Sequence, residues 1–302
     1  MTALVEAQVL GPQAHNSRRA RRSRPRRLGL IPTIVLLIGA AYTLVPVLWV
    51  VIAATKDRSK LFSTFTLAPS FGSGMADNVR AMLTYENGLY LTWARNSLLY
   101  AGAGSLLAVA FSAMAGYGLA KYRFRGRNIM FGILLASVLI PQITLAIPQY
   151  LLMAKADLSN TYWAVLLPSV VYPYGIYLCR IYAAAAVPDE MLEAGRLDGA
   201  SEWRMFRSIG LPVMFPGLIT VFLVAFVSNW NNFLLPFIML SDQDKYPITV
   251  GLYTLLSQGV DQPVLYSIII AGAMMSIIPL VVLFLVLQRY WRMDLLSGGV
   301  KG

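Results

Sequence analysis

The sequence contains very little cysteine, histidine or charge. Its 302 residues include one cysteine, Cys179, and one histidine, His15, which excludes an internal disulfide, a thiolate metal cage, a HExxH zinc site and a His-dependent triad. No GxxxxGK[ST] segment occurs, so the chain has no P-loop for ATP. Only 13% of residues are charged and 57% are hydrophobic, whereas soluble domains carry about 25% charged residues. These figures exclude soluble, disordered and collagen-like chains and predict an all-α polytopic membrane protein.

Uncharged runs long enough to cross a bilayer, about 20 residues, occur six times. They cover 31–53, 96–120, 129–154, 158–179, 209–240 and 262–288. The fifth run is longer than one crossing needs, and we expect its membrane part near 216–236. Six crossings place both termini on the same side of the membrane.

The basic residues are distributed unevenly between the two predicted faces. Of the 25 Lys and Arg residues, 18 fall in the N-terminal tail, in the loops after the second and fourth spans and at the C-terminus. The positive-inside rule assigns this face to the cytoplasm, with both termini. The RRARRSRPRR stretch abuts the first span, where anionic lipid headgroups attract each basic side chain by about 1 kcal/mol. Membrane lipid is therefore the expected partner of this charge, and nucleic acid is not.

None of the six runs contains a charged residue, although several contain amide side chains. Ion-coupled carriers usually need an ionisable group inside the bilayer, so energy for uphill transport is expected from a partner. The amides at membrane depth allow two interpretations, interhelical hydrogen bonding or a polar translocation path for an uncharged, hydroxyl-rich solute. The residues concerned are Gln142, Gln149, Asn229, Trp230, Asn231 and Asn232.

The loop between the fourth and fifth spans, 188–212, reads PDEMLEAGRLDGASEWRMFRSIGLP. A proline followed by acids is typical of a first helical turn, and Asp198-Gly199 is expected to stop that helix in a left-handed cap. Ser201 can then cap a second short helix, on which Trp203, Phe206 and Ile209 form one apolar stripe. The pattern predicts a helix–turn–helix, with Glu193 exposed on its first helix.

This segment resembles the EAA loop of bacterial ABC importer permeases, in which EAA, Gly and Ile-x-Leu-Pro follow at fixed spacings. The matching residues are Glu193-Ala194-Gly195, Gly199 and Ile209-Gly210-Leu211-Pro212, with Gly195 in place of the second alanine. The stretches LDGASEWRMFR, SNWNNFLLPF and LLSGGVKG are similar to the carbohydrate-uptake branch, in particular the smaller six-span subunit of maltose-type permeases.

The resemblance implies a non-enzymatic, type I ABC importer permease in the bacterial cell membrane. It implies a heterodimer with a homologous permease, two copies of an ATPase that bind ATP and Mg, and an extracytoplasmic substrate-binding protein; the chain itself would hold no cofactor or metal. The implied ATPase-coupling residues are Glu193, Ala194, Gly195, Asp198, Gly199, Ala200, Trp203, Phe206, Ile209, Leu211 and Pro212. The tail residues Gly298, Gly299, Val300 and Lys301 would reach into the ATPase dimer.

The expected organisation has four parts. A basic cytoplasmic tail covers 1–27, the first span and an extracytoplasmic loop cover 28–94, the remaining transmembrane domain covers 95–290, and a cytoplasmic tail covers 291–302. The solute is expected to be a sugar or oligosaccharide. A permease for glycerol phosphate or a polyol is the alternative within the family, and an ion-coupled carrier or channel is the alternative outside it.

Overall fold

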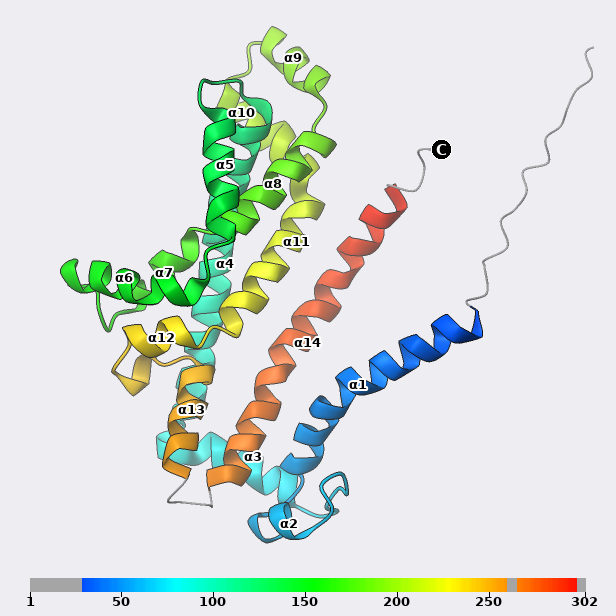
Figure 1. Ribbon diagram of the computed structural model, residues 1–302, viewed down its shortest axis with the longest axis vertical. Coiled ribbons are helices and arrows are strands. Elements are labelled where there is room, and N and C mark those ends of the chain that lie inside the picture. The colour runs from blue at the N-terminus through cyan, green and yellow to red at the C-terminus, as the bar shows by residue number, and fades with distance from the viewer. Residues whose placement is uncertain (1–28, 260–264, 298–302) are drawn as a thin grey trace, which may run out of the picture. The chain divides into compact units, whose positions relative to one another are not determined.

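The computed structural model describes residues 29–259 and 265–297, and within them all regular structure is helical (Figure 1). The chain divides into two compact units, Met1–Pro46 and Val47–Gly302, which are treated separately. The first unit contributes the start of α1 (Leu30–Ala54), a helix with a mean hydropathy of 2.4 in its spanning window. Apolar residues on all sides of a helix this long are typical of a membrane span.

Five helical segments in the described residues are long and apolar enough to cross a membrane. They are α1, α4 (Leu89–Lys121), Tyr162–Ala186, Glu202–Trp230 and Leu265–Tyr290 within α14 (Leu265–Ser297). A sixth arises when the pair α5 (Arg127–Val138) and α6 (Gln142–Lys155) counts as one broken span. Shorter elements connect them, namely α2 (Arg58–Ser63), α3 (Gly74–Thr84), η1 (Tyr85–Asn87), α9 (Asp189–Leu197), α12 (Leu234–Met239), η3 (Gln243–Lys245) and α13 (Ile248–Gly259).

The third predicted span, 129–154, is not one continuous helix but two, which meet at a proline. The chain bends by 103° between α5 and α6, and Pro141 occupies the N-cap of α6 in an extended conformation. Proline lacks an amide donor and disfavours helical conformation in the residue before it, so the helix stops at the bend. The bend separates two apolar helices of 12 and 14 residues.

The fourth predicted span, 158–179, is displaced along the chain. The structure starts it at Tyr162 and continues it to Ala186, through α7 (Tyr162–Val170) and α8 (Pro173–Ala186). The helical segment extends past the predicted end at Cys179 and includes Arg180. The guanidinium carbon of Arg180 lies 3.5 Å from the centre of the Phe131 ring on α5, a cation–π contact that offsets part of the cost of burying the charge.

The fifth span also differs from its predicted position near 216–236. Its helix runs from Glu202 to Trp230 through α10 (Glu202–Met205), the π-helical segment η2 (Phe206–Gly210) and α11 (Leu211–Trp230). The chain leaves the helix at Asn231, before the separate short helix α12.

Helix α4 forms the centre of the second unit and contacts α7, α8, α11 and α13. Small buried residues on α4 allow this close packing. A Cβ atom at Gly116 would lie 2.5 Å from the Cβ of Cys179 on α8, so the two backbones approach as closely as glycine permits. Polar and functional residues on α7, α8 and α11 are thereby held around one helix.

Candidate functional site

Helix α9 begins and ends as its sequence predicts. Pro188 is its extended N-cap, and Asp189 and Glu190 occupy the first turn, where acids complement the helix dipole. Gly199 is left-handed, with a φ of +74°. The amide of Ala200 donates to the carbonyl of Gly195 at 2.9 Å, and the amide of Gly199 donates to the carbonyl of Arg196 at 3.0 Å. This pair of bonds is a Schellman motif, and it confirms the predicted glycine stop.

The second loop helix starts as predicted but is not short. The hydroxyl of Ser201 accepts a hydrogen bond from the amide of Arg204 at 3.3 Å, which confirms the predicted N-cap. Beyond Met205 the helix continues through η2 into α11 without a stop, because Gly210 is right-handed (φ −60°). The widened π-helical turn accommodates Pro212, which offers no amide donor to the preceding turn. One continuous helix therefore joins the loop to the fifth span.

The apolar stripe on this helix is divided between the interior and the surface. Phe206 is buried in a cluster with Tyr117, Leu192 and Met205, and Ile209, Leu211 and Ala200 pack against it; we call this set the coupling-end cluster. Trp203 is 62% exposed and meets Phe206 only along one side, with ring centres 5.4 Å apart. The inward side of the stripe fixes the loop, and Trp203 remains available to a partner.

Two ion pairs tie α9 to its neighbours. The Lys121 ammonium on α4, whose side chain is only 6% exposed, lies 2.7 Å from Asp189 Oδ1 and donates to the Val187 carbonyl at 2.6 Å. The hydrogen bond from Lys121 to the Asp189 carboxylate, together with the charge of Lys121, lowers the pKa of Asp189. Arg196 pairs with Glu202 at 3.0 Å and joins α9 to α10. Sequence analysis did not single out Lys121, because its partner lies 68 residues further along the chain.

The remaining loop residues divide into an exposed face and a tightly packed face. Glu193 is exposed, which confirms the prediction for this residue. Ala194, Asp198 and Pro212 are exposed as well. Gly195 faces inward, where a Cβ would lie 3.3 Å from the sulfur of Met205, so the side chain of Met205 occupies the space next to this departure from the EAA pattern. The hydroxyl of Tyr117 is buried beside this loop and makes no hydrogen bond with any described residue.

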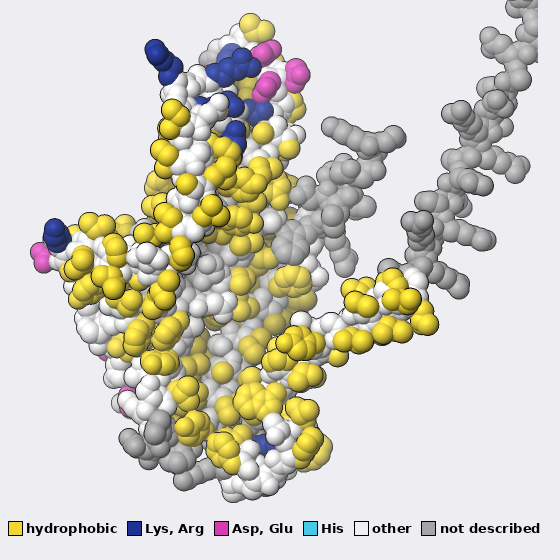
Figure 2. Space-filling view, viewed as in Figure 1, with side chains coloured by type: hydrophobic (Ala, Val, Ile, Leu, Met, Phe, Trp, Pro, Cys, Tyr) yellow, Lys and Arg dark blue, Asp and Glu magenta, His cyan; other side chains and the backbone are white. Residues whose placement is uncertain are grey.

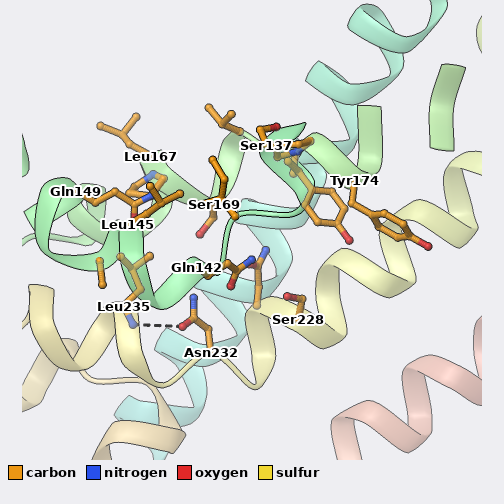
Figure 3. Close-up of a pocket in the computed structure, with 18 of the residues that line it drawn as sticks. Ser137, Gln142, Leu145, Gln149, Leu167, Ser169, Tyr174, Ser228, Asn232 and Leu235 are labelled. Carbon is orange, nitrogen blue, oxygen red and sulfur yellow. Dashed lines mark hydrogen bonds between the residues drawn. The ribbon is translucent and has the colours of Figure 1, made fainter. Parts of the chain in front are cut away.

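A separate cavity of about 630 Å³ lies where α5, α6, α7, α8, α11 and α12 meet. It contains four of the predicted path residues, Gln142, Gln149, Asn229 and Asn232. Figure 3 shows Gln142, Ser169 and Asn232 directed toward the same interior space from different segments. Further polar groups are contributed by Ser137, Ser169, Tyr172, Tyr174 and Ser228. No residue that lines the cavity is charged.

The polar side chains of the cavity are only partly engaged with the protein. The side-chain amide of Asn229 donates to the hydroxyl of Ser105 at 3.0 Å. The side-chain oxygen of Asn232 accepts from the backbone amide of Leu235 at 3.4 Å. Gln142 and Gln149 make no side-chain hydrogen bond within the part of the chain that the structure describes. An amide offers two donors and an acceptor, so these groups retain capacity for a ligand.

Two predicted path residues do not line the cavity. Trp230 is 4% exposed and stacks on Phe226, with ring centres 5.8 Å apart. Asn231 is exposed and donates to the Val227 carbonyl of its own helix at 2.8 Å. The predicted tail residues Gly298, Gly299, Val300 and Lys301 lie outside the described residues.

Sequence analysis missed the cavity residues on α5, α7 and α8. Ser137, Ser169, Tyr172 and Tyr174 are separated from Asn229 by 55 or more positions, and no motif joins them. The prolines near them, Pro141, Pro168 and Pro173, are the one available signal, since each breaks or kinks a span where the cavity forms.

The sequence matches a family described as binding-protein-dependent transport system inner membrane component over residues 108–292. It is 37% identical over 282 residues to an arabinooligosaccharide transport system permease protein of Halalkalibacterium halodurans, covering 92% of this chain and 99% of that protein. A lactose transport system permease protein of Rhizobium radiobacter is 30% identical over 92% of this chain and 98% of that protein. An sn-glycerol-3-phosphate transport system permease protein of Pectobacterium atrosepticum is 26% identical, over 90% and 98%.

The fold resembles one chain of a bacterial ABC transporter involved in the import of the acidic polysaccharide alginate. The TM-score is 0.75 at 22% identity, over 87% of this chain and 95% of the other.

Proposed function

The chain belongs to the family of binding-protein-dependent transport system inner membrane components, and on that premise we propose that it imports an uncharged sugar or oligosaccharide. As a multi-pass permease of an ABC importer, it functions with an ATPase and a substrate-binding protein. In our proposal it pairs with a homologous permease and two ATPase copies, which bind the ATP and Mg, and this chain carries no cofactor. Both termini lie in the cytoplasm.

The proposal of a neutral solute rests on the cavity lining, which contains no charged residue. Amides, hydroxyls and tyrosine rings beside apolar residues suit a neutral, hydroxyl-rich molecule. Glycerol phosphate and acidic polysaccharides are anions, which proteins bind mainly with arginine and lysine side chains. The lining supports a neutral sugar over glycerol phosphate, although relatives of both kinds exist.

The continuous helix of the fifth span supports a direct route from ATPase to solute. Helix α9 would receive the push of ATPase closure and pass it to Glu202 and the α10 helix start through the Arg196–Glu202 pair. From Glu202 to Trp230 the helix spans about 40 Å, at about 1.5 Å per residue, and Asn229 at its far end lines the cavity. Motion of the loop would therefore displace the cavity lining, as alternating access requires.

The solute proposal is tested on the purified complex with its binding protein. Neutral oligosaccharides, glycerol phosphate and uronic-acid oligomers are compared for stimulation of ATP hydrolysis. We expect stimulation by one or more neutral sugars only. Stimulation by the anions alone would refute the neutral-sugar assignment and leave the family assignment intact.

The coupling proposal is tested at two exposed loop positions. Glu193→Lys reverses a charge on the exposed face, and Gly199→Val forces a branched side chain into a left-handed conformation at a cost of about 1–2 kcal/mol. Both variants should insert normally, yet retain less ATPase or hydrolyse ATP without uptake. The matched control is Asp77→Lys, an equal charge reversal on exposed α3 at the opposite end of the second unit (Figure 1). Parental coupling in both loop variants would exclude the loop as the coupling element.

The proposed orientation of the chain in the membrane rests on the uneven distribution of Lys and Arg between its two faces. It is tested by cysteine labelling in a Cys179→Ser background. Cysteines at Arg125 and Arg204 should react only after the cytoplasmic side is opened, and cysteines at Tyr85 and Gln258 should react from outside. External labelling at position 125 or 204 would reverse the orientation.

A further inference from the structure

A second cavity, of about 460 Å³, lies at the turn between α4 and α5. It is open to solvent and is lined by Arg123, Phe124, Gly126, Arg127, Asn128 and Ile129. Figure 2 shows both Lys and Arg and Asp and Glu side chains at this end of the second unit, with hydrophobic side chains along α5 below them. Neither the solute cavity nor the coupling loop includes these residues.

The two arginines of this cavity are not neutralised by the protein. Neither Arg123 nor Arg127 forms an ion pair with a described residue, and the segment from Lys121 to Val138 contains no acid. Arg127 donates one hydrogen bond to the Tyr122 carbonyl at 3.3 Å and keeps its other donors. Asp189 is the carboxylate that Arg123 influences, and Lys121 already pairs with it at 2.7 Å. The cavity therefore presents net positive charge and several free guanidinium donors.

The surface next to the cavity is apolar and continues along α5. Ile129 lines the cavity and is 71% exposed, and Met130 and Ile133 are 55% and 66% exposed. When α5 and α6 are counted as one broken span, this apolar face of α5 is placed in the hydrocarbon next to the arginines. A ligand that fits both parts carries an anionic group at one end and long apolar chains at the other.

We propose that this cavity binds the phosphodiester headgroup of an anionic glycerophospholipid, with its acyl chains along Ile129 and Ile133. Guanidinium forks match phosphate oxygens, and basic pockets at the cytoplasmic membrane surface are suited to such headgroups. The cytoplasmic leaflet follows from the orientation in the proposed function, whereas the lipid site itself does not depend on the transported solute.

The test measures phospholipid that stays bound to the full transporter complex. The complex is purified in mild detergent, washed at high salt to screen exposed charges, and analysed by native mass spectrometry for retained phosphatidylglycerol. We expect retention to fall about fivefold in Arg123→Gln and about fivefold in Arg127→Gln, the effect of removing one basic contact to an anionic headgroup. Arg125→Gln is the matched control, because it removes the same charge from the same turn but does not line the cavity.

Three results would overturn the proposal. Equal losses in all three variants would indicate diffuse attraction to the membrane surface. Displacement of the lipid by inorganic phosphate would indicate a site for a free anion. If phosphatidylglycerol were retained only when the ATPase is bound, the arginines would contact the ATPase rather than a lipid headgroup. Because the measurement uses no transport substrate, a failed sugar assignment leaves its outcome unchanged. Arg123→Lys keeps the positive charge but loses the guanidinium fork, and it is measured in place of Arg123→Gln where the glutamine substitution prevents assembly.

Discussion

The loop around α9 and the cavity of about 630 Å³ differ in how their polar side chains are bonded. Around α9 two ion pairs join neighbouring elements, Lys121–Asp189 and Arg196–Glu202. In the cavity the polar side chains are uncharged, and Gln142 and Gln149 bond to no described residue. Paired charges fix the relative positions of helices, whereas unpaired amides leave hydrogen-bonding capacity for a solute that must pass. In the proposed function the first region transmits the motion of the ATPase and the second holds the solute.

The largest effect should follow from overpacking the coupling-end cluster. A Cβ at Gly210 would lie 2.7 Å from the Tyr117 ring, which is buried and held between Tyr122 and Phe206. Gly210→Leu should therefore destabilise the protein by about 1–3 kcal/mol and impair coupling. The thermal midpoint and the substrate-stimulated ATPase rate are measured against Gly132→Leu, at an α5 glycine with nothing within 4 Å. An unchanged midpoint in Gly210→Leu would show that this end is loosely packed.

The contrast between the regions also appears in what the sequence could predict. The caps at Gly199 and Ser201 depend on residues within a few positions, and the sequence located both. Pro141 marks a break in the third span, but the sequence does not give the size of the bend, 103°. The extension of the fourth helical segment to Arg180 was missed, because a run of apolar letters does not show which ring covers a charge. The amides of the cavity were found as a group, but their separation into Asn232 inside and Asn231 outside follows from where α11 ends.

The next effect separates cavity residues from their neighbours. Gln142→Leu removes an amide that lines the cavity without breaking a hydrogen bond to any described residue. Because one hydrogen bond contributes about 1 kcal/mol net, uptake should fall about fivefold while the thermal midpoint stays unchanged. Asn231→Leu is the control, since its amide bonds only to its own helix outside the cavity. Equal uptake by the two variants in vesicles would remove the distinction between lining and surface amides.

A smaller effect concerns Arg180 in the fourth helical segment. Arg180→Gln removes the cation–π contact with Phe131 and should cost about 1 kcal/mol, as should Phe131→Leu. If the two side chains act as a pair, the double variant should lose little more than either single variant. The thermal midpoints of the four proteins complete the cycle. Additive losses would mean that Arg180 is stabilised by other groups and that charge pairing is absent from this part of the bundle.

The smallest effect is a pH dependence at the coupling end. Lys121 lowers the pKa of Asp189 below its model-peptide value of 3.8, so the folded protein favours the carboxylate more strongly than the unfolded chain does. The resulting stabilisation is present above pH 4 and is lost as the pH falls through the lowered pKa, when Asp189 takes up a proton. Asp189→Asn should thus have a slightly lower thermal midpoint than the parent at neutral pH, and the difference should disappear under strongly acidic conditions. The carboxylate is 74% exposed, so solvent keeps the difference small. A gap that stays constant from neutral to acidic pH would assign the stabilisation to packing of the side chain rather than to its charge, and the ion pairs would no longer distinguish this end from the cavity.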